Sequence, residues 1–166
     1  MRRLATALLA LAPLASTAAE PAPAGPPPAS GGLTASASLG GGAELGLESG
    51  KAGLLELEAV AGYEIESVGV RPEIAAALGL APDGHVALRP GVRWTIPGFP
   101  IQLRAAFDAS NSRRSNLHWR WLLIGAAAEI RFTGLLGFFG EIDTGAPLAS
   151  GAGLPLLVRA GASFRF

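Results

Sequence analysis

From Leu33 to the C-terminus, stretches in which apolar and polar residues alternate are separated by short runs of turn-forming residues. A period of two is typical of a β-strand with one apolar face, because successive side chains point to opposite sides of a sheet. The pattern predicts eight strands, with the ranges Leu33–Glu48, Leu54–Ile65, Val68–Leu80, His85–Ile96, Ile101–Ala109, Leu117–Phe132, Leu136–Thr144 and Leu154–Phe166.

Two of these strands are irregular. Glu73–Leu80 also has the pattern of a short helix, although the strand count favours a strand. In the sixth strand, the apolar positions change from odd at Trp119 and Trp121 to even at Ala126. This change of phase predicts either a β-bulge near Leu122–Gly125 or a tryptophan-bearing end that rises above a lipid layer.

Pro72, Pro90 and Pro155 fall inside predicted strands. Proline cannot donate a hydrogen bond to a β-ladder, and a closed barrel has no free edge where that loss would be harmless. These three residues therefore argue against a closed barrel.

The alternation sorts most strands into an apolar face and a charged face, and three features favour lipid as the partner of the apolar face. A soluble sandwich or lipocalin-like barrel would show the same alternation with the apolar face inward. However, the apolar face is rich in Ala and Gly, and these side chains are too small to fill a protein core. The charged face uses Arg and Glu, and the chain has a single lysine, Lys51. Finally, aromatic residues fall at strand ends.

These aromatic residues form two belts when the chain is threaded with its N-terminus in the periplasm. Odd-numbered strands then run outward and even-numbered strands return. Such belts mark the two interfaces of a membrane. The periplasmic belt contains Tyr63, Trp94, Phe132, Phe138, Phe164 and Phe166, and the outer belt contains Phe107, Trp119 and Trp121.

The N-terminus has the layout of a secretory signal peptide, predicted over residues 1–19. Arg2 and Arg3 precede the apolar run Leu4–Leu14, which is followed by small residues up to Ala19. This run is too short for a membrane-spanning helix, which needs roughly 20 apolar residues. The next segment, Glu20–Gly32, is rich in Pro, Ala and Gly and is predicted to be a disordered leader. The barrel domain is predicted over 33–166.

Composition excludes several classes of protein. The formal net charge is zero, so nothing in the sequence indicates binding to nucleic acid. The absence of cysteine excludes disulfides, thiolate metal sites and a lipoprotein anchor. Mean hydropathy is positive, although no apolar run after the signal is long enough for a transmembrane helix. A lipid-facing sheet with alternating faces accounts for both observations.

The last strand carries the pattern Ala160-x-Ala162-x-Phe164-x-Phe166. Together with the signal peptide and the eight alternating stretches, this pattern resembles the small eight-stranded outer-membrane proteins of the OmpA/OmpX type. The resemblance implies an all-β fold, an eight-stranded antiparallel up-and-down transmembrane β-barrel in the outer membrane of a Gram-negative bacterium. It also implies that Phe166 is an assembly signal read by the barrel-assembly machinery. We expect a monomer that contacts outer-membrane lipids.

The charged face would line the barrel interior, which in an eight-stranded barrel is just wide enough for side chains. Unpaired buried charges cost several kcal/mol each, so a mutually paired network is expected. Arginine suits such a network because its planar guanidinium can bridge two carboxylates. The predicted inward acids are Glu44, Glu56, Glu58, Glu64, Glu73, Asp108, Glu129, Glu141 and Asp143, and the predicted inward bases are Arg71, Arg89, Arg93, Arg104, Arg131, Arg159 and Arg165.

These features predict a structural or surface-interaction role, with the interior plugged by the Arg/Glu network. One alternative is a narrow channel for small solutes or ions. The other is a soluble periplasmic barrel that binds an apolar ligand, in which the Leu/Ala face would point inward.

Candidate chemistry is sparse, and we expect neither an enzyme nor a cofactor. The chain has two histidines, His85 and His118, and neither has a serine at a spacing typical of a catalytic pair. There is no phosphate-binding loop and no spacing of metal ligands. Arg113 and Arg114 lie in a predicted outer loop, either as ordinary solvated charge or as contacts for lipopolysaccharide phosphates.

Overall fold

The computed structural model describes residues 31–47, 50–82, 84–112 and 115–166. Its regular elements are all strands, as the alternation predicts. The eight strands are β1 (Gly32–Leu47), β2 (Gly50–Glu64), β3 (Val70–Ala81), β4 (His85–Thr95), β5 (Ile101–Ser112), β6 (Ser115–Arg131), β7 (Leu136–Pro147) and β8 (Leu154–Arg165).

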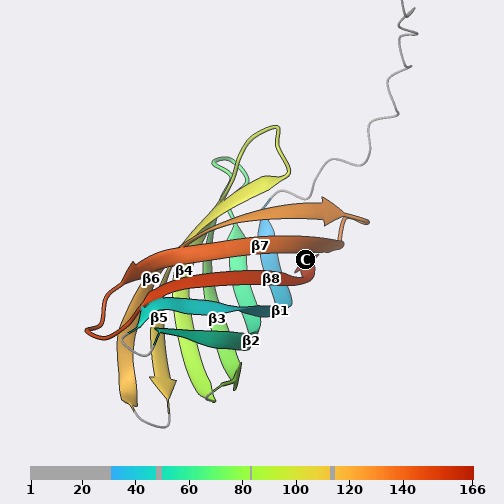
Figure 1. Cartoon of the computed structure of the whole chain (residues 1–166). Coiled ribbons are helices and arrows are strands. Elements are labelled where there is room, and N and C mark those ends of the chain that lie inside the picture. The colour runs from blue at the N-terminus through green and yellow to red at the C-terminus, as the bar shows by residue number, and fades with distance from the viewer. Residues whose placement is uncertain (1–30, 48–49, 83, 113–114) are drawn as a thin grey trace, which may run out of the picture.

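Each strand pairs antiparallel with the next one along the chain, and β8 pairs with β1 to close the barrel. At this seam, Phe164 lies opposite Ala35 and Leu154 lies opposite Leu45. The red β8 and the blue β1 show the closure in Figure 1. The predicted eight-stranded antiparallel up-and-down barrel is confirmed, and closure removes the free edges that an open sheet would expose.

The predicted ranges differ from the observed ones mainly at the ends of hairpins. The alternation of β5 and β6 becomes irregular near Ala109 and Leu117, yet their ladder continues to Ser112 and Ser115. The ambiguous segment Glu73–Leu80 is strand throughout. Gly32, assigned to the leader, is instead the first residue of β1. The predicted signal peptide and the rest of the leader, up to residue 30, lie outside the described residues.

The three prolines are accommodated at positions where one neighbouring ladder has no pair. In the described ladders, the β2–β3 register ends at Gly62 and Glu73, one residue before it would reach Pro72. The β4–β5 register skips Pro90, and the β7–β8 register starts one residue after Pro155. Each proline still pairs on its other side. The missing donors therefore do not prevent closure.

A β-bulge at Arg120 explains the change of phase in β6. Asp108 of β5 lies opposite Trp121, whereas the next residue, Ala109, lies opposite Trp119. Arg120 is therefore one extra residue on β6, and Trp119 faces outward, opposite to the side that strict alternation from Trp121 gives. The bulge lies just before the range that the sequence predicts.

The apolar face of the barrel points outward and the charged face points inward. Leu39, Leu57 and Leu78 are 52%, 45% and 49% exposed, whereas Arg89 is fully buried. A soluble barrel that binds an apolar ligand requires the opposite arrangement. Its prediction that the Leu/Ala face points inward is therefore wrong. None of the described residues forms a helix with the length and apolarity needed to cross a membrane.

Candidate functional site

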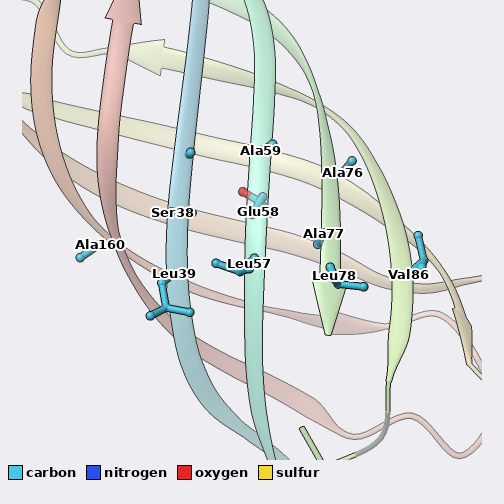
Figure 2. Close-up of a pocket in the computed structure, with 11 residues that line it drawn as sticks. Ser38, Leu39, Leu57, Glu58, Ala59, Ala76, Ala77, Leu78, Val86 and Ala160 are labelled. Carbon is cyan, nitrogen blue, oxygen red and sulfur yellow. The ribbon is translucent and has the colours of Figure 1, made fainter. Parts of the chain in front are cut away.

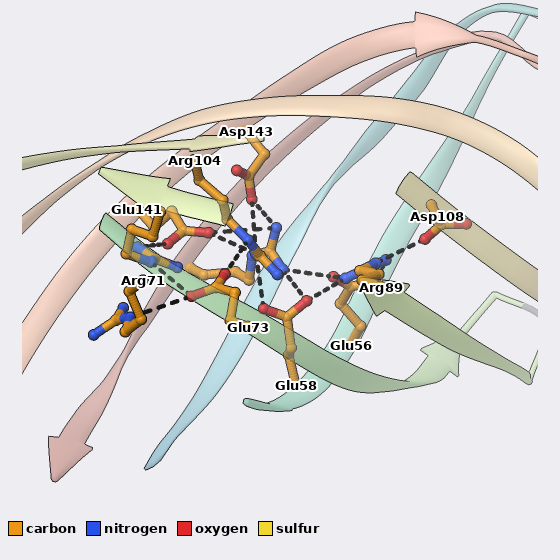
Figure 3. Close-up of polar contacts among 11 residues, drawn as sticks. Glu56, Glu58, Arg71, Glu73, Arg89, Arg104, Asp108, Glu141 and Asp143 are labelled. Atoms are coloured by element: carbon orange, nitrogen blue, oxygen red, sulfur yellow. Dashed lines mark hydrogen bonds and ion pairs between the residues drawn. The ribbon is translucent and has the colours of Figure 1, made fainter. Parts of the chain in front are cut away.

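The densest polar cluster in the barrel interior is built around Arg89 of β4. Its Nη1 and Nη2 donate to the two carboxylate oxygens of Glu56 at 2.6 and 2.8 Å. Its Nη1 also donates to Glu58 at 2.6 Å, and its Nε donates to Asp108 at 2.7 Å. Figure 3 shows the guanidinium between the acids of β2 and that of β5. All four side chains are buried, so Arg89 links two sides of the barrel without contact with solvent.

Glu58 connects this cluster to two more arginines. Its Oε1 accepts from Arg104 Nη1 at 2.9 Å, and its Oε2 accepts from Arg159 Nη1 at 2.5 Å. Arg159 also pairs with Asp143 of β7. Glu58 thus contacts arginines from β4, β5 and β8, which are strands at different positions around the barrel.

Glu73 and Glu141 extend the network toward the end of the barrel that holds Gly32 and Phe166, which we call the terminal end. Arg104 contacts both acids at 2.9 Å. Arg93 reaches Glu141 at 2.6 Å and Glu73 at 3.2 Å, and Arg71 lies 3.4 Å from Glu73. Each acid here is shared by at least two arginines, which is how a barrel interior satisfies buried charge.

Glycines on the inner face make room for these side chains. A Cβ at Gly40 would overlap the Arg159 side chain, and a Cβ at Gly125 would overlap Asp143 Oδ1. Gly125 and Asp143 face each other across the β6–β7 ladder. The high glycine content is therefore explained in part by packing inside the barrel, where a larger residue would collide with the ion-paired side chains.

A second group of contacts lies toward the terminal end. Glu64 pairs with Arg165 at 3.0 Å. Glu129 accepts from Gln102 at 2.6 Å and from Ser163 at 2.7 Å, and lies 3.3 Å from Arg131. A cavity of about 10 Å³ lies among Ser36, Arg71, Arg93, Gln102, Glu129, Phe139 and Ser163. That volume is about what one water needs.

At the end of the barrel opposite Gly32 and Phe166, a group that the sequence did not predict joins β1, β6 and the β7–β8 connection. Glu44 accepts from Arg120 Nη2 at 2.5 Å and from the Gly153 backbone N–H at 2.7 Å. Trp121 Nε1–H donates to the Gly153 carbonyl at 2.9 Å, and the Arg120 guanidinium lies 4.3 Å from the Trp121 ring centroid. Arg120 thus joins the interior arginines.

The assignment of Trp121 to the outer aromatic belt is wrong. Trp121 is 1% exposed because it keeps the inward phase of Leu123 and Ala127, and the bulge at Arg120 lies between it and the outward-facing Trp119. The signal was present in the sequence as the change of phase, but the position of the bulge was not.

The other aromatic residues of the two predicted belts are on the outer face. Phe107 and Trp119 contact each other edge to face at 5.9 Å, as do Phe132 and Phe138 at 5.2 Å. The remaining members are also exposed, and they are Tyr63, Trp94, Phe164 and Phe166.

An apolar recess lies on the outer face. It has a volume of about 540 Å³ and crosses strands β1 to β4 and β8. Figure 2 shows Leu39, Leu57, Leu78 and Val86 in a row across four of these strands. Ala37, Ala59 and Ala76 also line the recess. Alanine side chains beside the row of larger residues leave space on the outer face.

The histidines lie in different environments. His85 is buried, and its Nε2 lies 3.8 Å from Glu56. His118 is exposed, and its Nδ1 lies 2.7 Å from the Asn116 carbonyl. Within the described ranges, no group of three or more His, Asp or Glu side chains is arranged to hold a metal ion. Arg113 and Arg114 lie outside the described residues.

Comparison with solved structures gives the class of protein to which this fold corresponds. The fold is that of small eight-stranded outer-membrane barrels of the OmpA/OmpX type. No protein-family model matches the chain, and neither does any curated protein sequence.

Three solved barrels illustrate the likeness. Neisserial surface protein A aligns with a TM-score of 0.57 and 12% identity, over 81% of this chain and 97% of its own. Ail of Yersinia pestis, solved with the heparin analogue sucrose octasulfate, aligns with a TM-score of 0.54 and 12% identity, over 81% and 99%. The N-terminal barrel domain of Pseudomonas aeruginosa OprF aligns with a TM-score of 0.50 and 16% identity, over 82% and 99%.

Proposed function

We propose that this protein is an integral outer-membrane barrel with a structural or surface-interaction role, and that its interior is a plug and not a transport path. The single observation that carries the proposal is the filled interior. Arg89, Arg104 and Arg159 are each at most 2% exposed and cross-link acids from several strands. A path for solutes would need these side chains to separate, at a cost of several kcal/mol for each uncompensated charge.

Placement in the membrane is supported by the outer face. Large apolar side chains stay exposed along every strand, and a soluble protein rarely shows so continuous an apolar surface. Outer-membrane location further requires export by the predicted signal peptide and insertion by the barrel-assembly machinery. Lipid partners and a monomeric state complete the proposal, with lipopolysaccharide as the outer-leaflet lipid.

Membrane fractionation with gel migration tests the placement. The folded protein should extract only with detergent, and it should migrate differently before and after boiling. A soluble species with the same migration under both conditions would contradict it.

Conductance in planar bilayers tests the plug. We expect a non-conducting membrane under conditions in which protease protection of the same preparation shows insertion. Steady open channels from inserted protein would contradict the plugged interior and support the alternative of a narrow channel.

A further inference from the structure

The end of the barrel that holds Gly32 and Phe166 is lined by exposed apolar residues. We call this end the terminal rim and define it by Leu33, Val68, Phe99, Leu135 and Phe166. Val68, Phe99 and Leu135 lie in the β2–β3, β4–β5 and β6–β7 turns and are 58%, 63% and 65% exposed. Leu33 and Phe166 lie at the β1–β8 seam and are 63% and 72% exposed. Every strand connection at this end thus presents a large apolar side chain.

These side chains are held in place by ordered turns. In the β2–β3 turn, Val68 N–H donates to the Ile65 carbonyl at 3.3 Å. In the β4–β5 turn, Phe99 N–H donates to the Ile96 carbonyl at 3.1 Å. In the β6–β7 turn, the Thr133 hydroxyl accepts from the Leu135 N–H at 3.2 Å. The backbone of each turn is therefore ordered, and the exposure of Val68, Phe99 and Leu135 shows that their side chains lie outside the barrel interior.

The distribution of these residues indicates what covers them. They occur in all three turns and at the β1–β8 seam, so they are spread around the whole rim. Whatever covers them must therefore surround the barrel and cannot contact one side alone. The rim also continues the lipid-facing surface, because Phe132 and Phe164 lie directly beside it on the outer wall. A surrounding medium that is continuous with the lipid-facing wall is the bilayer itself.

Charge on the rim is consistent with a shallow position. Arg165 and Glu64 pair with each other, and Arg131 lies beside Glu129, so these charges are compensated near the interior. Glu66 is exposed in the β2–β3 turn, two residues before Val68. A carboxylate is expensive in hydrocarbon but not among headgroups. The turns therefore suit the boundary between headgroups and acyl chains.

We propose that the terminal rim is seated in the headgroup–acyl boundary of the inner leaflet, with lipid covering Val68, Phe99 and Leu135. The outer connections contrast with it, because Ser49-Gly50, Pro82–Gly84 and Ala149–Gly151 are small or polar in sequence, with Leu148 as the apolar exception. The proposal rests on the proposed function, since it requires a barrel in a membrane.

Single-cysteine variants provide the test, because the chain has no cysteine of its own. Val68→Cys, Phe99→Cys and Leu135→Cys are labelled with an environment-sensitive fluorophore. The labelled full-length proteins are folded into phospholipid vesicles with and without brominated acyl chains. Leu57→Cys on the outer wall serves as the membrane-embedded reference. Ser150→Cys in the exposed β7–β8 connection serves as the aqueous reference.

We expect blue-shifted emission and quenching by brominated chains at all three turn positions, weaker than at Leu57→Cys and clearly stronger than at Ser150→Cys. If Leu57→Cys is quenched and the three turn positions behave like Ser150→Cys, the rim is in water and this proposal is wrong, while the membrane placement stands. If Leu57→Cys is not quenched either, the membrane placement fails. Quenching at one turn alone would also overturn the proposal, because it would indicate a one-sided contact.

Discussion

Glu58 on β2 and Arg104 on β5 are 46 residues apart in sequence and meet inside the barrel, with 2.9 Å between Oε1 and Nη1. The other carboxylate oxygen of Glu58 accepts from Arg89 and Arg159. One carboxylate therefore compensates part of the charge of three buried guanidinium groups. Because these arginines come from three strands, Glu58 joins distant parts of the wall.

Replacing Glu58 by Gln should strongly destabilise the barrel. The amide keeps the shape of the side chain but removes the negative charge that three arginines share. Loss of one partner from a buried ion pair typically costs about 3–5 kcal/mol. Urea unfolding of protein refolded into lipid vesicles measures this loss.

Glu66→Gln is the matched control, since Glu66 is exposed in the β2–β3 turn. Surface substitutions of this kind usually change stability by about 0.5 kcal/mol or less. Equal stability of the Glu58→Gln variant and this control would show that the interior network does not depend on Glu58.

The inward position of the charges could be predicted from the sequence because it depends only on a period of two. Arg89, Arg93 and Arg104 all follow this rule and lie inside. Trp121 also follows this rule, whereas Trp119 does not, because the single extra residue at Arg120 turns Trp119 to the outer face. A bulge is a property of two paired strands, so the sequence of one strand shows that it exists but not where it lies.

The pairing within the network could not be predicted at all. Which carboxylate reaches Arg89 depends on the stagger between neighbouring strands and on the curvature of the closed sheet. Glu56 and Asp108 meet at this arginine although they lie on β2 and β5. The alternation places Gln102 and Ser163 on the inner face, but their bonds to Glu129 depend on the same stagger and could not be predicted.

Replacing Gly125 by Ala should destabilise the barrel through a steric conflict. The added methyl group would overlap Asp143 Oδ1 across the β6–β7 ladder. The Asp143 side chain cannot move away easily, because it is paired with Arg159. Overpacking of this kind typically costs about 1–3 kcal/mol. Urea unfolding in vesicles provides the measurement.

Gly140→Ala is the matched control, because a Cβ there meets no described atom within 4 Å. We expect this variant to unfold close to the wild-type urea concentration. A loss at Gly140→Ala as large as that at Gly125→Ala would attribute the effect to glycine in a strand and not to the contact with Asp143.

Replacing Trp121 by Phe should weaken the end of the barrel opposite Gly32 and Phe166. The ring is kept, but the Gly153 carbonyl loses the donor at 2.9 Å and the Arg120 guanidinium faces a poorer aromatic partner. A buried polar group left without its partner costs about 1–3 kcal/mol. Urea unfolding should show this loss, and protease accessibility of the β7–β8 connection should increase.

Trp119→Phe is the control for this substitution, since Trp119 is 53% exposed on the outer wall. Phenylalanine can retain its edge-to-face contact with Phe107. If both variants lose the same stability, the bond from Trp121 to Gly153 contributes nothing measurable.

Replacing Phe166 by Ala should reduce assembly in cells without a comparable loss of stability. The Phe166 ring is 72% exposed, so it contributes little to packing within the barrel. Its backbone N–H donates to the Leu33 carbonyl at 2.9 Å, a bond that alanine retains. We therefore expect a several-fold lower amount of heat-modifiable protein in the membrane fraction, together with nearly unchanged urea unfolding of the refolded protein.

Phe132→Ala tests whether this effect is specific to the last residue. Phe132 is 66% exposed at the same end of the barrel, so both substitutions remove a similar lipid-facing ring. Recognition of the last strand by the assembly machinery would reduce assembly of the Phe166→Ala variant only. An equal reduction in both variants would indicate that lost lipid contact lowers the yield, and that Phe166 carries no assembly signal of its own.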